Sequence, residues 1–260
     1  MINKNDVILF IGLGGAGQRH LRIFRDLLPK NEFFALRKKL KTPLLNPNFT
    51  LNESNSIEKK YDIKCINEEY LKNKIKPKLT IISTPTKFHT KYSLLAKSLG
   101  SNVFVEKPGI SSLEDFNKIK TNFLDSDLIY KIGFQRSYLT IIEKLKNLIK
   151  ESNNKDFECE LRLSSYIPDW HPYENFKELY ACKKELGGGV LLTECHEIDI
   201  LNNIFGEPLQ IESDLKREEK YNLNVYDTAI FKVDYKNCKA NINISFFRKP
   251  LERNIQFKNQ

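Results

Sequence analysis

The chain has 260 residues, which exceeds the usual size of one compact domain and predicts two. Hydrophobic residues make up 40% and aromatic residues 11%, enough apolar side chain to bury a core, which excludes an intrinsically disordered chain. The formal net charge is +9, but the lysines are scattered among acidic residues without forming a basic stripe, so we do not expect nucleic-acid binding.

Cysteine usage and the N-terminal segment indicate a cytoplasmic protein. The five cysteines form no Cys-x-x-Cys pair, and their odd number argues against a complete disulfide framework. No spacing of cysteine, histidine and carboxylate residues predicts a metal site. The apolar run near the N-terminus is broken by Gly12 and is too short for a signal or membrane segment, so we expect no membrane association.

The first part of the chain predicts strands that alternate with helices. Residues 7–11 are an apolar run typical of a strand buried on both faces, and a helical repeat of leucine and phenylalanine follows as far as Pro29. Residues 33–36 form a second buried run. Residues 38–56 are polar and contain two prolines, which predicts an irregular connection.

The alternation continues to about residue 135. Three further strands are predicted at 79–83, 102–105 and 128–132, with helical patterns at 92–96 and 113–123. Such an order indicates an α/β domain built on a doubly wound parallel sheet, a Rossmann domain, over residues 1–135.

A different pattern begins at residue 136. A helix is predicted at 138–150, strands near 156–166, 208–216, 225–235 and 238–248, and a helix at 190–205 among them. Several strands in succession indicate an α+β domain with a largely antiparallel sheet. We expect residues 136–260 to bind substrate and to support oligomerisation.

A dinucleotide-binding fingerprint follows the first predicted strand. The spacing Gly-x-Gly-x-x-Gly lies between a strand and a helix, as the fingerprint requires. Its first glycine permits the tight turn, the second lets a pyrophosphate approach, and the third lets the helix pack closely. A merely structural turn is the alternative. The expected cofactor-binding residues here are Gly12, Leu13, Gly14, Gly15, Ala16 and Gly17.

The end of the second strand favours NADP over NAD. An acid about twenty residues after the last glycine is typical of NAD sites, but Arg37 occupies that place and Lys38 and Lys39 follow. Guanidinium and ammonium groups pair with a 2′-phosphate, which a carboxylate would repel. The alternative is a solvated basic turn, in which case NAD remains the cofactor.

Several further segments follow the glycine fingerprint in a fixed order. They are Gln18-Arg19-His20, Ser83-Thr84-Pro85-Thr86-Lys87-Phe88-His89, Val105-Glu106-Lys107-Pro108, Pro168-Asp169-Trp170-His171-Pro172, and Gly187-Gly188-Gly189 followed by His196-Glu197-Ile198-Asp199. With these segments the chain resembles the Gfo/Idh/MocA oxidoreductase family over residues of about 7 to 250, and within it the subset associated with nonulosonate and surface-polysaccharide biosynthesis. The resemblance implies hydride transfer to or from a sugar-like hydroxyl.

The resemblance implies roles for residues of the first domain. The family's Glu-Lys-Pro motif, here Glu106 and Lys107 before a proline, places its lysine beside the nicotinamide and the reacting hydroxyl, where an ammonium group donates to the substrate oxygen. An exposed lysine with Glu106 as its ion-pair partner is the alternative. The cofactor-binding residues expected here are Ser83, Thr84, Pro85, His89, Glu106 and Lys107, with the backbone of Ser83, Thr84 and Pro85 lining the nicotinamide ribose. His89 is expected to cap or pack at the start of the next helix rather than to perform catalysis.

In the second domain the resemblance implies a general acid/base at His196, with Asp199 three residues further on the same helical face. The family usually has an aspartate four residues before this histidine, but position 192 is leucine. Thr193 and Glu194 follow in a motif one residue shorter, so Glu194 is the candidate replacement. A buried histidine that only satisfies a carbonyl group is the alternative.

The substrate pocket is expected to include Arg136, Trp170, Thr193 and Asp199, although Trp170 also suits a core anchor. The resemblance further implies a homo-oligomer and a small-molecule sugar substrate. Family members usually continue beyond the position of Gln260, so we expect a shorter second sheet here. Two competing hypotheses are a nucleotide-binding regulator without turnover and, ranked last, another Rossmann protein such as a methyltransferase.

Overall fold

The computed structural model describes residues 2–37, 42–53, 56–152, 156–171 and 173–259. The chain divides into two units, Met1–Gly133 and Phe134–Gln260. The division falls two residues before the boundary expected at 135. Each unit has its own sheet and its own buried core.

Unit 1 contains a six-stranded sheet in which every strand pair is parallel, as predicted. The strand order is β5-β2-β1-β6-β7-β8, so the chain changes direction between β1 and β6. In doubly wound sheets, ligands bind at the carboxyl ends of the strands beside such a reversal. The bounds are β1 (Ile8–Ile11), β2 (Phe33–Leu36), β5 (Ile63–Ile66), β6 (Leu79–Ile82), β7 (Asn102–Val105) and β8 (Tyr130–Ile132).

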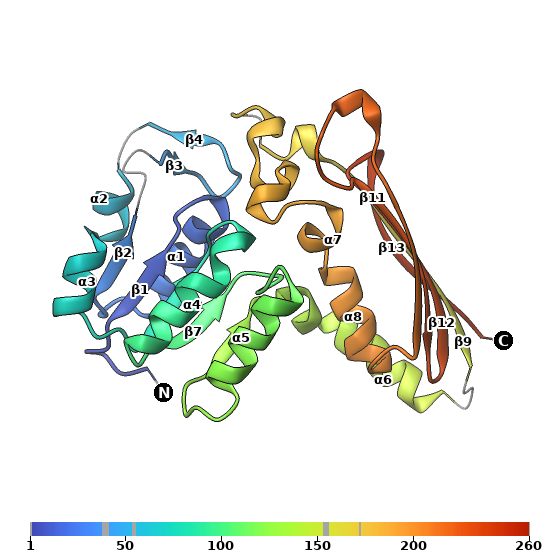
Figure 1. The fold of residues 1–260 in the computed structure, drawn as a ribbon, viewed down its shortest axis with the longest axis horizontal. Coiled ribbons are helices and arrows are strands. Elements are labelled where there is room, and N and C mark those ends of the chain that lie inside the picture. The colour runs from blue at the N-terminus through green and yellow to red at the C-terminus, as the bar shows by residue number, and fades with distance from the viewer. Residues whose placement is uncertain (1, 38–41, 54–55, 153–155, 172, 260) are drawn as a thin grey trace. The chain divides into compact units, whose positions relative to one another are not determined.

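Helices cover both faces of this sheet (Figure 1). Successive residues of β1 point to opposite faces: Ile8 and Phe10 pack in the cluster that contains residues of α1 and α2, and Leu9 and Ile11 in the cluster with α3, α4 and α5. Burial on both sides explains why the strands are continuous apolar runs. The helices are α1 (Gly15–Leu27), α2 (Ile57–Tyr61), α3 (Glu68–Lys74), α4 (His89–Ser98) and α5 (Leu113–Phe123).

The segment between β2 and β6 contains more structure than the sequence predicted. Part of the expected irregular connection at 38–56 is a small antiparallel hairpin of β3 (Leu44–Leu45) and β4 (Leu51–Asn52), and α2, β5 and α3 were missed. Each element is seven residues or shorter, too short for helical periodicity to stand out. Strand β5 lies at the sheet edge, where a burial requirement on both faces is absent.

Unit 2 contains a five-stranded sheet in the order β10-β11-β12-β9-β13. All pairs are antiparallel except β12 with β9, so the expected α+β domain with a largely antiparallel sheet is confirmed. The strands are β9 (Phe157–Tyr166), β10 (Gln210–Lys216), β11 (Thr228–Tyr235), β12 (Cys238–Ser245) and β13 (Phe247–Asn259).

One face of the second sheet is covered by helices (Figure 1). Alternate residues of β9, from Phe157 to Leu163, are buried in a core that also contains Val190 and Leu201 from the helices. The helices of this unit are α6 (Thr140–Glu151), α7 (Val190–Thr193) and α8 (His196–Phe205).

Two elements of unit 2 differ from the prediction. The single helix expected at 190–205 is divided, because Glu194 leaves the helical conformation with φ −107° and ψ 33°. The strand expected at 238–248 ends at Ser245, and β13 continues to Asn259 along β9. Strand β13 is polar because it lies at an edge of the sheet, so its hydrophobic pattern is weak. Within the described ranges, no helix has the length and apolarity that a membrane span requires.

Candidate active site

The glycine turn joins β1 to α1 with backbone contacts that exclude side chains. Gly12 has φ +94°, and a Cβ atom there would lie 2.7 Å from the carbonyl carbon of Ser83. A Cβ atom at Gly17 would lie 2.2 Å from the carbonyl oxygen of Gly12. Both positions therefore require glycine, and the turn packs directly on the end of β6.

Gly14 differs from these two positions because open space lies in front of it. A Cβ atom there would meet no atom of the described residues within 4 Å. The backbone amides at the N-terminus of α1, beginning at Gly15 and Ala16, lie beside that space. Leu13 is buried beneath the turn. The turn has the tight glycine geometry that the fingerprint predicts, and the open space at Gly14 fits a phosphate group.

The segment after β6 adds buried polar groups next to the glycine turn. The hydroxyl groups of Ser83 and Thr84 are buried and make no hydrogen bond to any described residue. Pro85 leads into the short 3₁₀ helix η1 (Thr86–Phe88).

His89 begins α4, as expected from the sequence. Its Nε2 lies 2.8 Å from the carbonyl oxygen of Thr84, and because a carbonyl only accepts, Nε2 donates. Burial lowers the pKa of His89 to about 4 despite this bond. His89 is therefore neutral at physiological pH and holds the backbone turn after β6.

Glu106 and Lys107 follow β7 at the same edge of the sheet. Glu106 is only 6% exposed, and its Oε1 lies 2.6 Å from Nε2 of His20 and 3.1 Å from Nη2 of Arg19. Burial raises the pKa of Glu106, but the hydrogen bond and charge of His20 with the charges of Arg19 and Lys107 outweigh it and hold the pKa at about 2. Glu106, expected among the cofactor-binding residues, contacts α1. Arg19 and His20 were not predicted as site residues.

Arg37 lies directly after β2, where the 2′-substituent of a dinucleotide was expected. Its side chain is 4% exposed and forms an ion pair with Glu58 of α2. Burial raises the pKa of Glu58, but hydrogen bonds from its own backbone and Cys65, with the charge of Arg37, lower it overall. The basic group therefore has a counter-ion within the protein. Lys38 and Lys39 lie outside the described residues.

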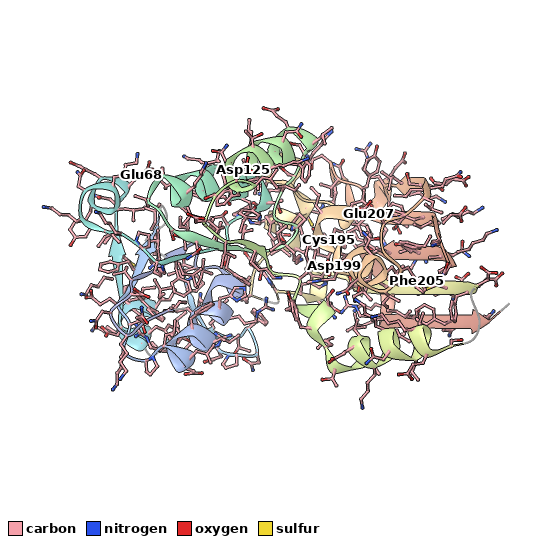
Figure 2. The ribbon with its side chains drawn as sticks, turned by 90° about the horizontal axis from the view of Figure 1, so that it is seen from below. Glu68, Asp125, Cys195, Asp199, Phe205 and Glu207 are labelled. Carbon is pink, nitrogen blue, oxygen red and sulfur yellow. The ribbon has the colours of Figure 1, made fainter. Side chains whose placement is uncertain are left out.

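In unit 2, His196 is the first residue of α8. Asp199, labelled in Figure 2, follows one turn later on the same helix. His196 is 3% exposed, and the ring of Phe134 meets it edge-on at 5.9 Å between centroids. The hydroxyl group of Ser137 donates to Oδ2 of Asp199. Phe134 and Ser137 flank the start of unit 2, so this segment packs on both candidate residues.

Glu194 lies in the break between α7 and α8, and an arginine from β13 accompanies it. Nη2 of Arg253 is 3.6 Å from Oε2 of Glu194, and Nε of Arg253 donates to Oε1 of Glu197 at 2.6 Å. Glu197 is 1% exposed. Arg253 and Glu197 were not predicted as site residues. Glu197 stood inside the motif beside His196, but no signal in the sequence joined it to position 253.

The remaining expected substrate residues occupy different environments in unit 2. Thr193 is buried at the end of α7, and Arg136 lies in the 3₁₀ helix η2 (Gln135–Tyr138). Trp170 packs edge-on against Phe246 at 5.5 Å, in the core position that the sequence also allowed. A search of the described part of the chain finds no cluster of three metal-ligating side chains.

The structure thus gathers the described first-domain candidates at one sheet edge. In the second domain it brings Glu194, His196 and Asp199 together at the start of α8, whereas Trp170 packs against Phe246. Comparison with known families matches both parts. Residues 7–134 match the model of the Gfo/Idh/MocA oxidoreductase family with an NAD-binding Rossmann fold, and residues 164–255 match that family's C-terminal α/β domain.

Two curated relatives match about half of the chain. An uncharacterised protein of Schizosaccharomyces pombe is 28% identical over 148 residues, 53% of this chain and 34% of that protein. The 2,7-anhydro-N-acetylneuraminate hydratase of Escherichia coli is 26% identical over 152 residues, 56% of this chain and 39% of that protein. The matched part of the chain thus spans well under half the length of either relative.

Solved structures match more of the chain at lower identity. The WlbA dehydrogenase of Bordetella pertussis, solved with NADH and UDP-GlcNAcA, has a TM-score of 0.80 at 14% identity and covers 100% of this chain and 73% of its own. The myo-inositol 2-dehydrogenase of Lactobacillus plantarum has a TM-score of 0.76 at 16% identity, covering 98% and 74%. At these identities the likeness shows the fold.

Proposed function

Because the chain belongs to the Gfo/Idh/MocA oxidoreductase family, we propose that it transfers a hydride between a nicotinamide dinucleotide and a hydroxyl or carbonyl group of a sugar derivative. One observation carries the proposal. The glycine turn after β1 and the Lys107 turn after β7 lie at the carboxyl edge of the parallel sheet, beside the reversal between β1 and β6.

The proposed chemistry divides among three side chains. When bound, the nicotinamide supplies or accepts the hydride. Lys107 donates a hydrogen bond to the substrate oxygen, which stabilises the charge that develops there. His196 acts as the general acid/base in this proposal, because an imidazole suits proton transfer near neutral pH. Glu194, held near Arg253, supports His196 in place of the aspartate common in the family.

For the cofactor we propose NADP(H), with NAD(H) accepted as well. Arg37 at the end of β2 favours a 2′-phosphate, since one guanidinium group can donate two parallel hydrogen bonds to a phosphate group. Glu58 moderates that preference because it already neutralises part of the charge. The WlbA structure that resembles this fold was solved with NADH, which is why NAD(H) is retained.

For the substrate we propose a sugar or nucleotide sugar of surface-polysaccharide biosynthesis. Support comes from proteins of the same fold, the WlbA dehydrogenase solved with UDP-GlcNAcA and myo-inositol 2-dehydrogenase. A curated relative is named as a hydratase of 2,7-anhydro-N-acetylneuraminate, which is also a sugar derivative. We also propose that the protein forms a homo-oligomer and is located in the cytoplasm.

The test combines cofactor binding with turnover. NADPH and NADH are titrated by nicotinamide fluorescence, and a panel of nucleotide sugars, inositols and free sugars is screened by absorbance. Lys107→Ala and His196→Ala should each lower turnover by about 10²–10⁴-fold while dinucleotide affinity stays within about threefold. Lys91→Ala, on the exposed side of α4, is the matched control. Near-normal turnover in both variants would overturn the assigned roles.

A regulator without turnover is the second candidate, because Leu192 occupies the position of the family's usual aspartate. Dinucleotide binding without absorbance change on any substrate of the panel would favour this candidate.

A further inference from the structure

Arg19 and His20 lie in the second turn of α1, immediately after the glycine turn, and both point to Glu106. Nε2 of His20 is 2.6 Å from Oε1 of Glu106, and Nη2 of Arg19 is 3.1 Å from the same oxygen. The side chain of His20 is 12% exposed and that of Glu106 is 8% exposed, so water is largely excluded from their contact. The side chain of Arg19 is 39% exposed and is more strongly screened.

The second oxygen of Glu106 turns back to the polypeptide that carries the candidate lysine. Oε2 accepts the backbone N–H of Lys107 at 3.2 Å. The carbonyl oxygen of Glu106 accepts the N–H of Gly109 at 3.0 Å, which closes a turn around Lys107. One carboxylate therefore connects α1 to the backbone of Lys107.

The ring of His20 is itself fixed from the side of β7. It meets the ring of Phe104 edge-on at 5.2 Å between centroids and 76° between planes. Phe104 lies on β7, two residues before Glu106, so His20 is held by both a ring contact and a hydrogen bond. A carboxylate buried as deeply as Glu106 needs such partners, because an unpaired charge in that environment is costly.

We infer that His20, supported by Arg19, is a positioning residue that acts through Glu106 on Lys107. The link sets the place of the Lys107 turn relative to the glycine turn that would seat the dinucleotide. It rests on the proposed function, because positioning matters for catalysis only if Lys107 works on the substrate. A displacement of a catalytic group by about 1 Å is enough to lower a rate by about 10²-fold.

The first test is independent of any substrate. Hydrogen exchange of the Lys107 amide, which Glu106 accepts, is measured in the full-length protein and in His20→Ala and Glu106→Gln. We expect exchange at least tenfold faster in both variants, because the hydrogen bond that protects this amide is weakened. Arg22→Ala, a basic residue on the same helix whose guanidinium contacts the carbonyl oxygen of Leu45, should leave the exchange rate unchanged. Unchanged exchange in both His20→Ala and Glu106→Gln would overturn the inference.

The second test uses turnover and dinucleotide affinity together. His20→Ala should lower kcat by about 10–100-fold and change the dinucleotide Kd by less than about threefold, while His20→Gln, which retains a donor, should recover most of kcat. The His20→Ala/Glu106→Gln pair should be no slower than Glu106→Gln alone, because both act through one contact. The positioning role would be overturned if the double variant lost kcat by the product of the two single-variant losses. It would also be overturned if dinucleotide affinity fell as much as kcat.

The two tests separate this inference from the proposed function. Faster Lys107 exchange in a protein that turns over no sugar would refute the oxidoreductase assignment while the structural link stands. If His20→Ala fails to fold, Glu106→Gln carries the exchange measurement, and His20→Gln, which retains a donor, is the variant expected to keep the native rate.

Discussion

Nε of Arg253 on β13 donates to Oε1 of Glu197 on α8 at 2.6 Å, which joins the last strand of unit 2 to the helix that begins at His196. Glu197 is 1% exposed, and its other oxygen accepts no hydrogen bond from the described residues. The carboxylate therefore depends on Arg253 for its compensating charge.

Replacing Arg253 should destabilise unit 2. Arg253→Met keeps the apolar stem but leaves the Glu197 carboxylate buried without its partner, which should cost about 2 kcal/mol because the arginine is partly exposed. Adding Glu197→Gln should recover most of this loss. Urea unfolding monitored by circular dichroism measures both. Arg248→Met, also on β13, is the control, and equal losses in the two arginine variants would contradict the proposed role of the contact.

Substitutions in the glycine turn should separate effects on dinucleotide affinity from effects on the stability of the fold. Gly14→Ala adds a methyl group to open space where a phosphate would approach, so dinucleotide affinity should fall by about tenfold or more with little change in Tm. Gly17→Ala places a methyl group 2.2 Å from the carbonyl oxygen of Gly12 and should destabilise the protein by about 1–3 kcal/mol. Fluorescence titration and thermal unfolding of both variants are the measurements. Unchanged dinucleotide affinity in Gly14→Ala would show that the phosphate does not bind beside Gly14.

Much of unit 1 was predictable because its strands are buried on both faces. Burial on both sides leaves continuous apolar runs, so β2 and β7 were predicted with the bounds the structure shows. The bounds of α5 were predicted from its helical periodicity. The same reasoning missed β5 and β13, since a strand at a sheet edge needs no such run.

The candidate site was predictable only where a motif is local in sequence. The glycine turn and the Glu106-Lys107 segment follow directly from spacing and neighbouring strands. Ion pairs between distant positions carry no such signal: Arg19 and Glu106 are 87 positions apart, and Arg253 and Glu197 are 56 apart. The counter-ion of Arg37 was missed for the same reason, since Glu58 lies in a helix that was not predicted.

Cofactor preference should respond to the pair of Arg37 and Glu58 in opposite directions. Glu58→Gln removes one counter-ion and should raise the ratio of NADPH to NADH affinity by about tenfold, because Glu58 then no longer neutralises the guanidinium charge that would attract a 2′-phosphate. Arg37→Ala should lower the ratio by a similar factor. Titrations with both dinucleotides measure it, and Glu32→Gln, whose exposed ion pair is with Lys64, is the control. A ratio that stays constant in both variants would remove Arg37 from the cofactor site.

Stability below neutral pH should depend on His89. Its pKa is about 4 in the folded protein because of burial, below the ordinary value of 6.5, so the folded protein binds fewer protons than the unfolded chain. The stabilisation from neutral His89 is fully present above pH 6.5 and is lost progressively as the pH falls toward 4. The loss should amount to about 3 kcal/mol.

His89→Asn tests this dependence, because asparagine does not titrate. Urea midpoints measured from pH 7.5 to pH 4.5 should fall more steeply for the native protein than for His89→Asn, whatever the absolute stability of the variant. Ser98→Asn, an exposed position at the other end of α4 whose side chain does not titrate, should follow the native curve. Parallel curves for the native protein and His89→Asn would contradict this prediction. They would mean that His89 has the same pKa in the folded protein as in the unfolded chain, so that burial does not keep it neutral.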